Sequence, residues 1–241
     1  MGSERMRWEV YITGPQSVLS EMALAFNDGE PTITREGDQF LVRSRTFENM
    51  VDASEVRIEA ERIVEALSGI SRILLQGDAQ LKIASVVEVK AGGSRNIFVQ
   101  LEPAVLRMTG GLMSSIVTRG DGRVEEHRPS DPAPKWLAKA LNDPAAARAL
   151  RLRDAGLLSW TDLYRLYEVI EAGVGGESAI LEKTWASRSQ LRQFKHSANS
   201  VSAAGDEARH GVEPTQPPAK AMTLPDARSL VDGLLQQWLE N

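Results

Sequence analysis

The chain has 241 residues, of which 28 are Lys or Arg and 33 are Asp or Glu, so its formal net charge is −5. Its 42% of hydrophobic and 25% of charged residues are ordinary for a globular protein and exclude global disorder and a general nucleic-acid coat protein. The absence of cysteine excludes disulfides, thiolate zinc sites and a cysteine nucleophile. No segment approaches the about 20 apolar residues of a membrane span, and residues 1–10 lack the apolar core of a signal peptide. We therefore expect a cytoplasmic protein without a membrane partner.

The first hundred residues predict alternating strands and helices. Trp8, Val10 and Ile12 alternate with Glu9, Tyr11 and Thr13, which is typical of a strand with one buried face. Short loops with Gly join two pairs of apolar runs, as in hairpins. The patterns predict strands at 7–13, 32–35, 39–43, 81–89 and 96–101, and helices at 17–26 and 56–67.

A capping box is predicted at the start of the second helix. The Asp52 carboxylate can accept from exposed backbone N–H groups, while Glu55 reaches back toward the helix start. Val51 and Val56 have the spacing of a hydrophobic staple. Apolar residues at helical spacing follow as far as Leu67, so this helix should pack on the sheet.

The order of these elements is β-α-β-β-α-β with an additional strand. This order resembles the ferredoxin-like split βαβ sandwich, in which two helices cover one face of an antiparallel sheet. The resemblance implies a docking surface and no particular activity, because many unrelated functions use this fold.

Residues 103–135 predict a transition between two domains. We expect the apolar residues between Leu106 and Val117 to extend the sheet as another strand pair with a bend at Gly110-Gly111, and residues 119–123 to form a hairpin turn. Three prolines between Arg128 and Pro134 disfavour a helix and a central strand, which favours a domain linker. We predict a sandwich domain at 1–128, a linker and first helix at 129–143, and a helical domain at 144–241.

The pattern after residue 143 is helical. Ser159 can cap one helix, and Ser187 with Gln190 has the spacing of a second capping box. The last helix begins near Thr223, and its broad apolar stripe predicts a core helix, with a dimerisation face as the alternative. The predicted fold class is therefore α+β, with an N-terminal antiparallel sheet and two helices in split βαβ-like order, followed by a C-terminal all-helical bundle.

Basic residues and two of the three histidines gather between residues 188 and 210. A histidine can exchange a proton with a ribose hydroxyl, and an arginine can hold a phosphate by two hydrogen bonds. The alternative is a solvated helix face, with a histidine interacting with a helix end. The candidate catalytic residues are Arg192, His196, Arg209 and His210, and the candidate binding residues are Arg188, Lys195 and Asn199.

The sequence Arg209-His210-Gly211, which follows a helical region, resembles the polar motif region of HEPN-type domains. The resemblance covers residues 144–241 and implies a helical bundle of bacterial toxin and defence systems, some members of which cut RNA. Nuclease members carry an Arg and a His separated by four to six residues on one helix. Arg192 and His196 are closer than that spacing, although they share a helical face.

No metal site or cofactor is predicted. Glu125, Glu126 and His127 are adjacent, so their side chains diverge, and no phosphate-loop or dinucleotide motif is present. We interpret the chain as a cytoplasmic, noncatalytic binding or regulatory protein that recognises a protein partner or self-associates. The alternative is a HEPN-like, RNA- or nucleotide-directed enzyme of a bacterial defence or toxin system, with RNA or a nucleotide as its ligand.

Overall fold

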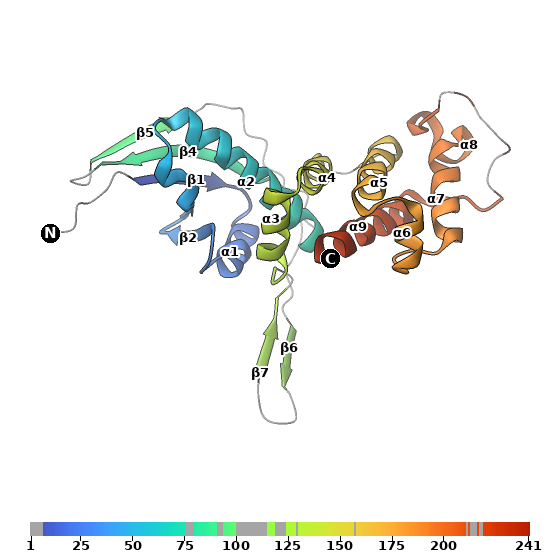
Figure 1. Cartoon of the computed structure of the whole chain (residues 1–241), viewed down its shortest axis with the longest axis horizontal. Coiled ribbons are helices and arrows are strands. Elements are labelled where there is room, and N and C mark those ends of the chain that lie inside the picture. The colour runs from blue at the N-terminus through green and yellow to red at the C-terminus, as the bar shows by residue number, and fades with distance from the viewer. Residues whose placement is uncertain are drawn as a thin grey trace. The chain divides into compact units, whose positions relative to one another are not determined.

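The computed structural model describes residues 7–75, 80–90, 94–99, 115–118, 124–128, 130–156, 158–210, 212, 216 and 219–241 (Figure 1). The chain divides into two compact units, Met1–Leu141 and Asn142–Asn241. Among the described residues, no helix combines the length and the apolar character needed to cross a membrane. The α+β fold class is confirmed, since the first unit contains an antiparallel sheet and the second is helical.

The first unit contains a five-stranded sheet with the order β2-β3-β1-β4-β5, in which all neighbouring strands are antiparallel. Strand β3 therefore separates β1 from β2, and β1 separates β3 from β4, which is the predicted split βαβ arrangement with β5 added at one edge. The elements are β1 (Arg7–Thr13), α1 (Gln16–Ala25), β2 (Thr32–Glu36), β3 (Gln39–Arg43), the 3₁₀ turn η1 (Arg45–Asn49), α2 (Ala53–Leu74), β4 (Lys82–Val89) and β5 (Arg95–Val99).

The central strand β1 is buried on both faces of the sheet, so the prediction of one buried face is wrong. Trp8, Val10 and Ile12 form the predicted apolar face, and α2 packs against β1 and β4. On the other face, Tyr11 joins a buried cluster with Leu41, Val87 and Val89. Glu9 shares that face and is fully buried. Alternation alone could not reveal this burial, because the residues around Glu9 come from other strands.

Helix α2 begins at the predicted cap. Asp52 accepts hydrogen bonds from the hydroxyl of Ser54 and from the N–H groups of Glu55 and Ser54, which lower the pKa of its carboxyl. Glu55 reaches back to accept from the N–H of Val51 at 2.9 Å. The Val51 side chain is 80% exposed, so the predicted staple with Val56 does not form. The helix continues beyond Leu67 to Leu74.

Strands β6 (Ser115–Thr118) and β7 (Val124–His127) form a separate two-stranded sheet. The expectation that this region extends the main sheet is therefore wrong for β6, whereas the predicted strand near Leu106, the Gly110-Gly111 bend and the turn at 119–123 lie outside the described residues. Helix α3 (Ala133–Asn142) begins inside the predicted linker, because a proline is tolerated in a first helical turn. Residues just before it contact α1, where the Ser130 hydroxyl donates to Glu21 at 3.2 Å.

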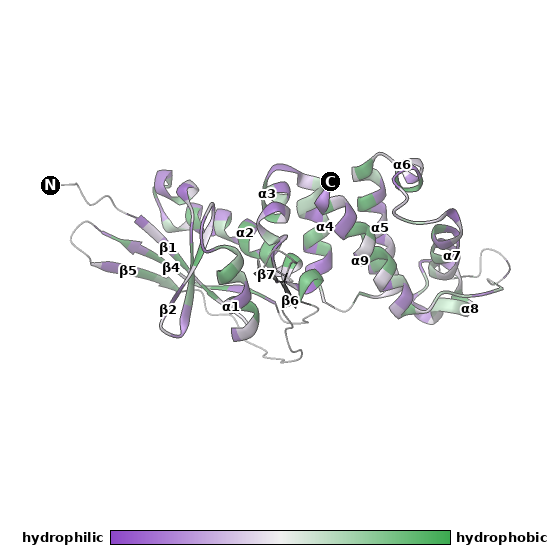
Figure 2. Ribbon diagram, turned by 90° about the horizontal axis from the view of Figure 1, so that it is seen from below, coloured by the Kyte–Doolittle hydropathy of each residue, from purple (hydrophilic) through white to green (hydrophobic). Residues whose placement is uncertain are grey.

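The regular secondary structure described in the second unit consists of helices. Its elements are α4 (Pro144–Asp154), α5 (Trp160–Val174), α6 (Glu177–Glu182), α7 (Arg188–Asn199), α8 (Val201–Ala204), the 3₁₀ turn η2 (Gly205–Glu207) and α9 (Leu224–Glu240). The predicted cap at Ser159 and the predicted capping box at Ser187 are confirmed, and Ser159 also forms a capping box with Asp162. Helices α4 and α9 both pack against α5. In Figure 2, α5 and α9 each carry both hydrophobic and hydrophilic residues, as expected of helices with one buried face. The apolar stripe of α9 is buried, as a core helix requires.

Candidate functional site

Helix α7 positions most of the predicted site residues. Its buried face is fixed by Phe194, whose ring lies 5.4 Å from that of Tyr167, 6.0 Å from that of Tyr164 and 6.3 Å from that of Trp160. Ser187 caps its first turn. Because the aromatic face is anchored on α5, the polar face of α7 has a defined orientation.

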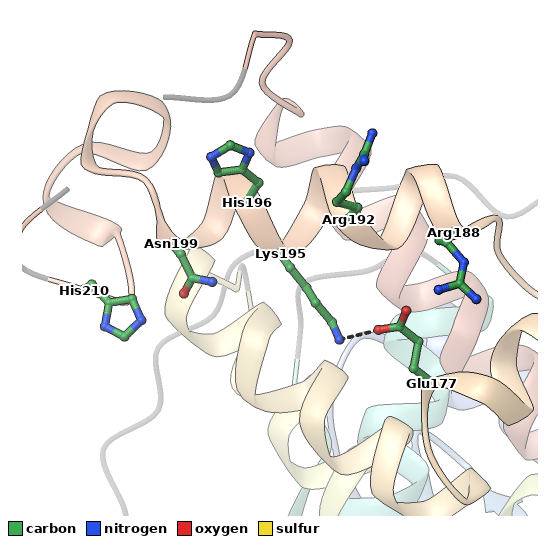
Figure 3. A pocket seen from close by; sticks show the side chains of 7 residues that line it. All are labelled: Glu177, Arg188, Arg192, Lys195, His196, Asn199 and His210. Carbon is green, nitrogen blue, oxygen red and sulfur yellow. Dashed lines mark hydrogen bonds and ion pairs between the residues drawn. The ribbon is translucent and has the colours of Figure 1, made fainter. Parts of the chain in front are cut away.

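A pocket of about 690 Å³ borders this polar face (Figure 3). It is lined by Glu177, Arg188, Arg192, Lys195, His196, Asn199 and His210, so six of the predicted site residues border one space. Their side chains do not converge on one point. In Figure 3, Lys195 extends toward Glu177, whereas Arg192 and His196 extend from the other side of the helix.

Lys195 is held by two carboxylates. Its Nζ lies 2.7 Å from Oε2 of Glu177 and 3.2 Å from Oε1 of Glu171, and it sits 4.9 Å above the ring of Tyr167. Burial acts to lower the pKa of Lys195, but hydrogen bonds with Glu177, Tyr167 and Glu171 outweigh it and raise the pKa above its ordinary value. For Tyr167, burial has the opposite effect and raises the pKa of the hydroxyl, although the nearby Lys195 acts to lower it. Lys195 is therefore a charged link between α5, α6 and α7.

His196 and Asn199 differ in their hydrogen bonding. Nε2 of His196 lies 2.8 Å from the carbonyl oxygen of Gln216, so one ring nitrogen contacts the backbone. Oδ1 of Asn199 is buried and has no hydrogen-bond partner in the described part of the chain. Groups of three or more His, Asp or Glu that could hold a metal ion are not found among the described residues. The geometry therefore offers a polar pocket without an assembled acid, base and phosphate ligand.

Arg209 and His210 are neighbours in sequence with different surroundings. Nη2 of Arg209 lies 3.0 Å from Oε1 of Glu168, and its guanidinium stacks 4.3 Å from the ring of Tyr164. The backbone N–H of Arg209 also donates to the backbone carbonyl of Ala198 at 2.9 Å. Arg209 thus ties the segment after η2 to α5 and α7, while His210 lines the pocket.

A second surface, which the sequence reasoning missed, lies on the edge strand β5. Ile97 is 64% exposed, Phe98 45% and Val99 61%, and β5 is the last strand of the sheet that the described residues form. Successive side chains of a strand point to opposite faces of the sheet, so three consecutive apolar residues place apolar side chains on both faces. This break in alternation was the available sequence signal, although it does not tell an edge strand from a central one.

Strand β5 is anchored to β1 on both faces of the sheet. On one face, Arg95 lies 3.6 Å from Oε2 of the buried Glu9 and donates to the Tyr11 hydroxyl at 3.3 Å. On the other, the rings of Phe98 and Trp8 are 6.2 Å apart. These contacts reach across β4, so the exposed edge is held in a defined position.

The buried Glu9 is the centre of this anchor. Its Oε1 lies 3.1 Å from Nη2 of Arg43 and 3.2 Å from Nη2 of Arg7. Arg43 also contacts Glu36 at 2.8 Å. Burial acts to lower the pKa of Arg43, but the hydrogen bonds with Glu9 and Glu36 outweigh it and raise the pKa above its ordinary value.

No protein-family profile, curated protein or solved structure matches this chain. The HEPN-like resemblance of residues 144–241 therefore stays a prediction.

Proposed function

We propose that the chain is a cytoplasmic, noncatalytic binding protein that recognises a protein partner by adding a strand to β5. The observation that carries this proposal is the exposed apolar edge formed by Ile97, Phe98 and Val99. A sheet edge presents unpaired N–H and C=O groups, and proteins usually protect such edges with Lys, Pro or a bulge. None of these protections lies within β5, whose sequence is Arg-Asn-Ile-Phe-Val. An extended segment that pairs with this edge gains main-chain hydrogen bonds and buries apolar side chains.

The contacts of three predicted catalytic or binding residues support a noncatalytic role. Lys195 and Arg209 are paired with carboxylates, and His196 contacts the carbonyl of Gln216. An incoming phosphate would have to compete with these carboxylates for Lys195 and Arg209.

Selection of peptides from a random phage-displayed library tests the strand-binding function. We expect enrichment of extended, β-branched peptides on the wild-type chain and its loss on the double variant Ile97→Lys with Val99→Lys. The matched control is Val51→Lys with Ile58→Lys, which adds the same charge at apolar residues that are 80% and 63% exposed outside β5. Peptides that bind the wild type and the β5 variant equally well would refute the proposal.

The second candidate function is RNA- or nucleotide-directed catalysis of the HEPN type. It is favoured by one observation, that Arg192, His196 and His210 line the same pocket. Incubation of RNA with the purified chain and with His196→Ala, at about pH 6 to 8 without added metal, separates the two functions. Loss of a general acid or base removes about a hundredfold to ten-thousandfold in rate. Cleavage by the wild type that disappears in the variant would overturn the noncatalytic proposal, which expects no cleavage by either.

A further inference from the structure

The sequence of β5 is complementary to itself when two copies run antiparallel. In the register centred on Phe98, each Phe98 faces the other, and Ile97 faces Val99. All three exposed apolar residues then meet apolar residues, and aromatic and β-branched pairs of this kind stabilise antiparallel strands. The register centred on Ile97 is worse, since it places Asn96 opposite Phe98 and Arg95 opposite Val99.

In this register, the apolar side chains on each face of the sheet lie next to apolar side chains of the second copy. Ile97 lies opposite Val87 in β4, so Val87, Ile97 and Val99 of the second copy form one apolar row. Phe98 lies opposite Val86 on the face that carries Trp8. Two-fold pairing therefore brings the Phe98 and Trp8 rings of both copies to one side of the joined sheet.

Charge and order also favour a second copy. Arg95 is the one charged residue within β5, and it lies at the end of the strand, so the register centred on Phe98 places no like charges opposite each other. Its guanidinium is already engaged by Glu9 and Tyr11. The strand is thus ordered before binding, which removes an entropic cost that a mobile segment would carry.

We infer that the partner of β5 is a second copy of this chain, which joins the two five-stranded sheets into one antiparallel sheet of ten strands across a two-fold axis. This inference rests on the proposed strand-binding function and names its partner. Closed two-fold pairing also satisfies the β5 edge in both copies, so association through β5 stops at the dimer.

Light scattering coupled to size-exclusion chromatography of the full chain tests the inference over a concentration series. The wild type should approach twice the chain mass of 26.4 kDa as its concentration rises. Ile97→Lys with Val99→Lys should remain at the mass of one chain, and the control Val51→Lys with Ile58→Lys should behave as the wild type. Circular dichroism verifies that each variant is folded. A wild type of single-chain mass at every concentration, or a folded β5 variant that still dimerises, would overturn the inference.

The register is tested by cross-linking, for which the absence of native cysteine is an advantage. Directly opposite residues in antiparallel strands have Cβ atoms about 4.5 to 5.5 Å apart, near the separation in disulfides. A mixture of Ile97→Cys and Val99→Cys chains should therefore form disulfide-linked dimers several-fold faster under mild oxidation than either variant alone. Equal rates in the three samples would refute the register centred on Phe98.

The outcomes also distinguish this inference from the function on which it rests. A monomeric wild type that selects peptides through β5 refutes the second copy as partner and retains strand binding. A monomeric wild type that selects no peptide refutes both.

Discussion

Replacement of Glu9 by Gln removes the buried charge that pairs with Arg7 in β1, Arg43 in β3 and Arg95 in β5, while it preserves the shape of the side chain. Loss of one partner of a fully buried ion pair costs about 3 to 5 kcal/mol, whereas an exposed pair contributes about 0.2 to 1 kcal/mol. The Glu9 side chain is 0% exposed, but those of Arg7, Arg43 and Arg95 are 58%, 35% and 45% exposed and can be rehydrated. Arg43 also keeps Glu36. We therefore expect the free energy of unfolding of the first unit to fall by about 1 to 3 kcal/mol.

Urea denaturation followed by circular dichroism measures this loss, and hydrogen exchange locates it. Exchange should become faster in β1 and β5, because Arg95 loses its charged partner in Glu9. The control is Glu61→Gln on α2, which removes an exposed pair with Arg57. A loss for Glu9→Gln no greater than that of the control, with β5 exchange unchanged, would refute the anchoring role of Glu9.

Two further predictions concern helix packing and pH. A methyl group at Gly173 would overlap the Trp238 ring, so Gly173→Ala should lower the free energy of unfolding by about 1 to 2 kcal/mol. A methyl group at Gly233 meets nothing within 4 Å, so Gly233→Ala should raise the free energy of unfolding by about 0.5 to 1 kcal/mol. Equal urea midpoints for these two variants would contradict the packing of α5 against α9. The pKa of Asp52 is lowered in the folded chain, so its contribution is present above the unfolded value of about 3.9 and is lost as the pH falls through the folded pKa. The difference in urea midpoint between wild type and Asp52→Asn should therefore shrink from about pH 7 to about pH 3, and a constant difference would exclude this linkage.

The elements that the sequence predicted correctly are those set by local interactions. Asp52, Ser159 and Ser187 each cap a helix through groups within three residues, so their roles can be read from spacing. The extent of burial is not local. Glu9 is buried by residues of distant strands, and Val51 stays exposed although its spacing favours a staple.

The same distinction applies to the candidate site. Helical spacing predicts that Arg192 and His196 share a face of α7, and both line the pocket. The carboxylates that neutralise Lys195 lie 18 and 24 residues away in sequence, and the partner of Arg209 lies 41 residues away. A single sequence does not show such pairings. A basic residue in a structural ion pair therefore cannot be told from one that binds a phosphate.

The two surfaces differ in what a ligand gains by binding to them. At α7, an anion that binds Lys195 must displace Glu171 or Glu177, so one ion pair is exchanged for another and the net gain is small. At β5, Ile97 and Val99 are more than half exposed, and each Å² of apolar surface removed from water contributes about 25 cal/mol. The main-chain groups at the outer edge also gain partners, with no contact within β5 broken. Binding energy is therefore more readily available at the edge strand than at the basic pocket, which is why the sheet and not the histidine-bearing helix carries the proposed function.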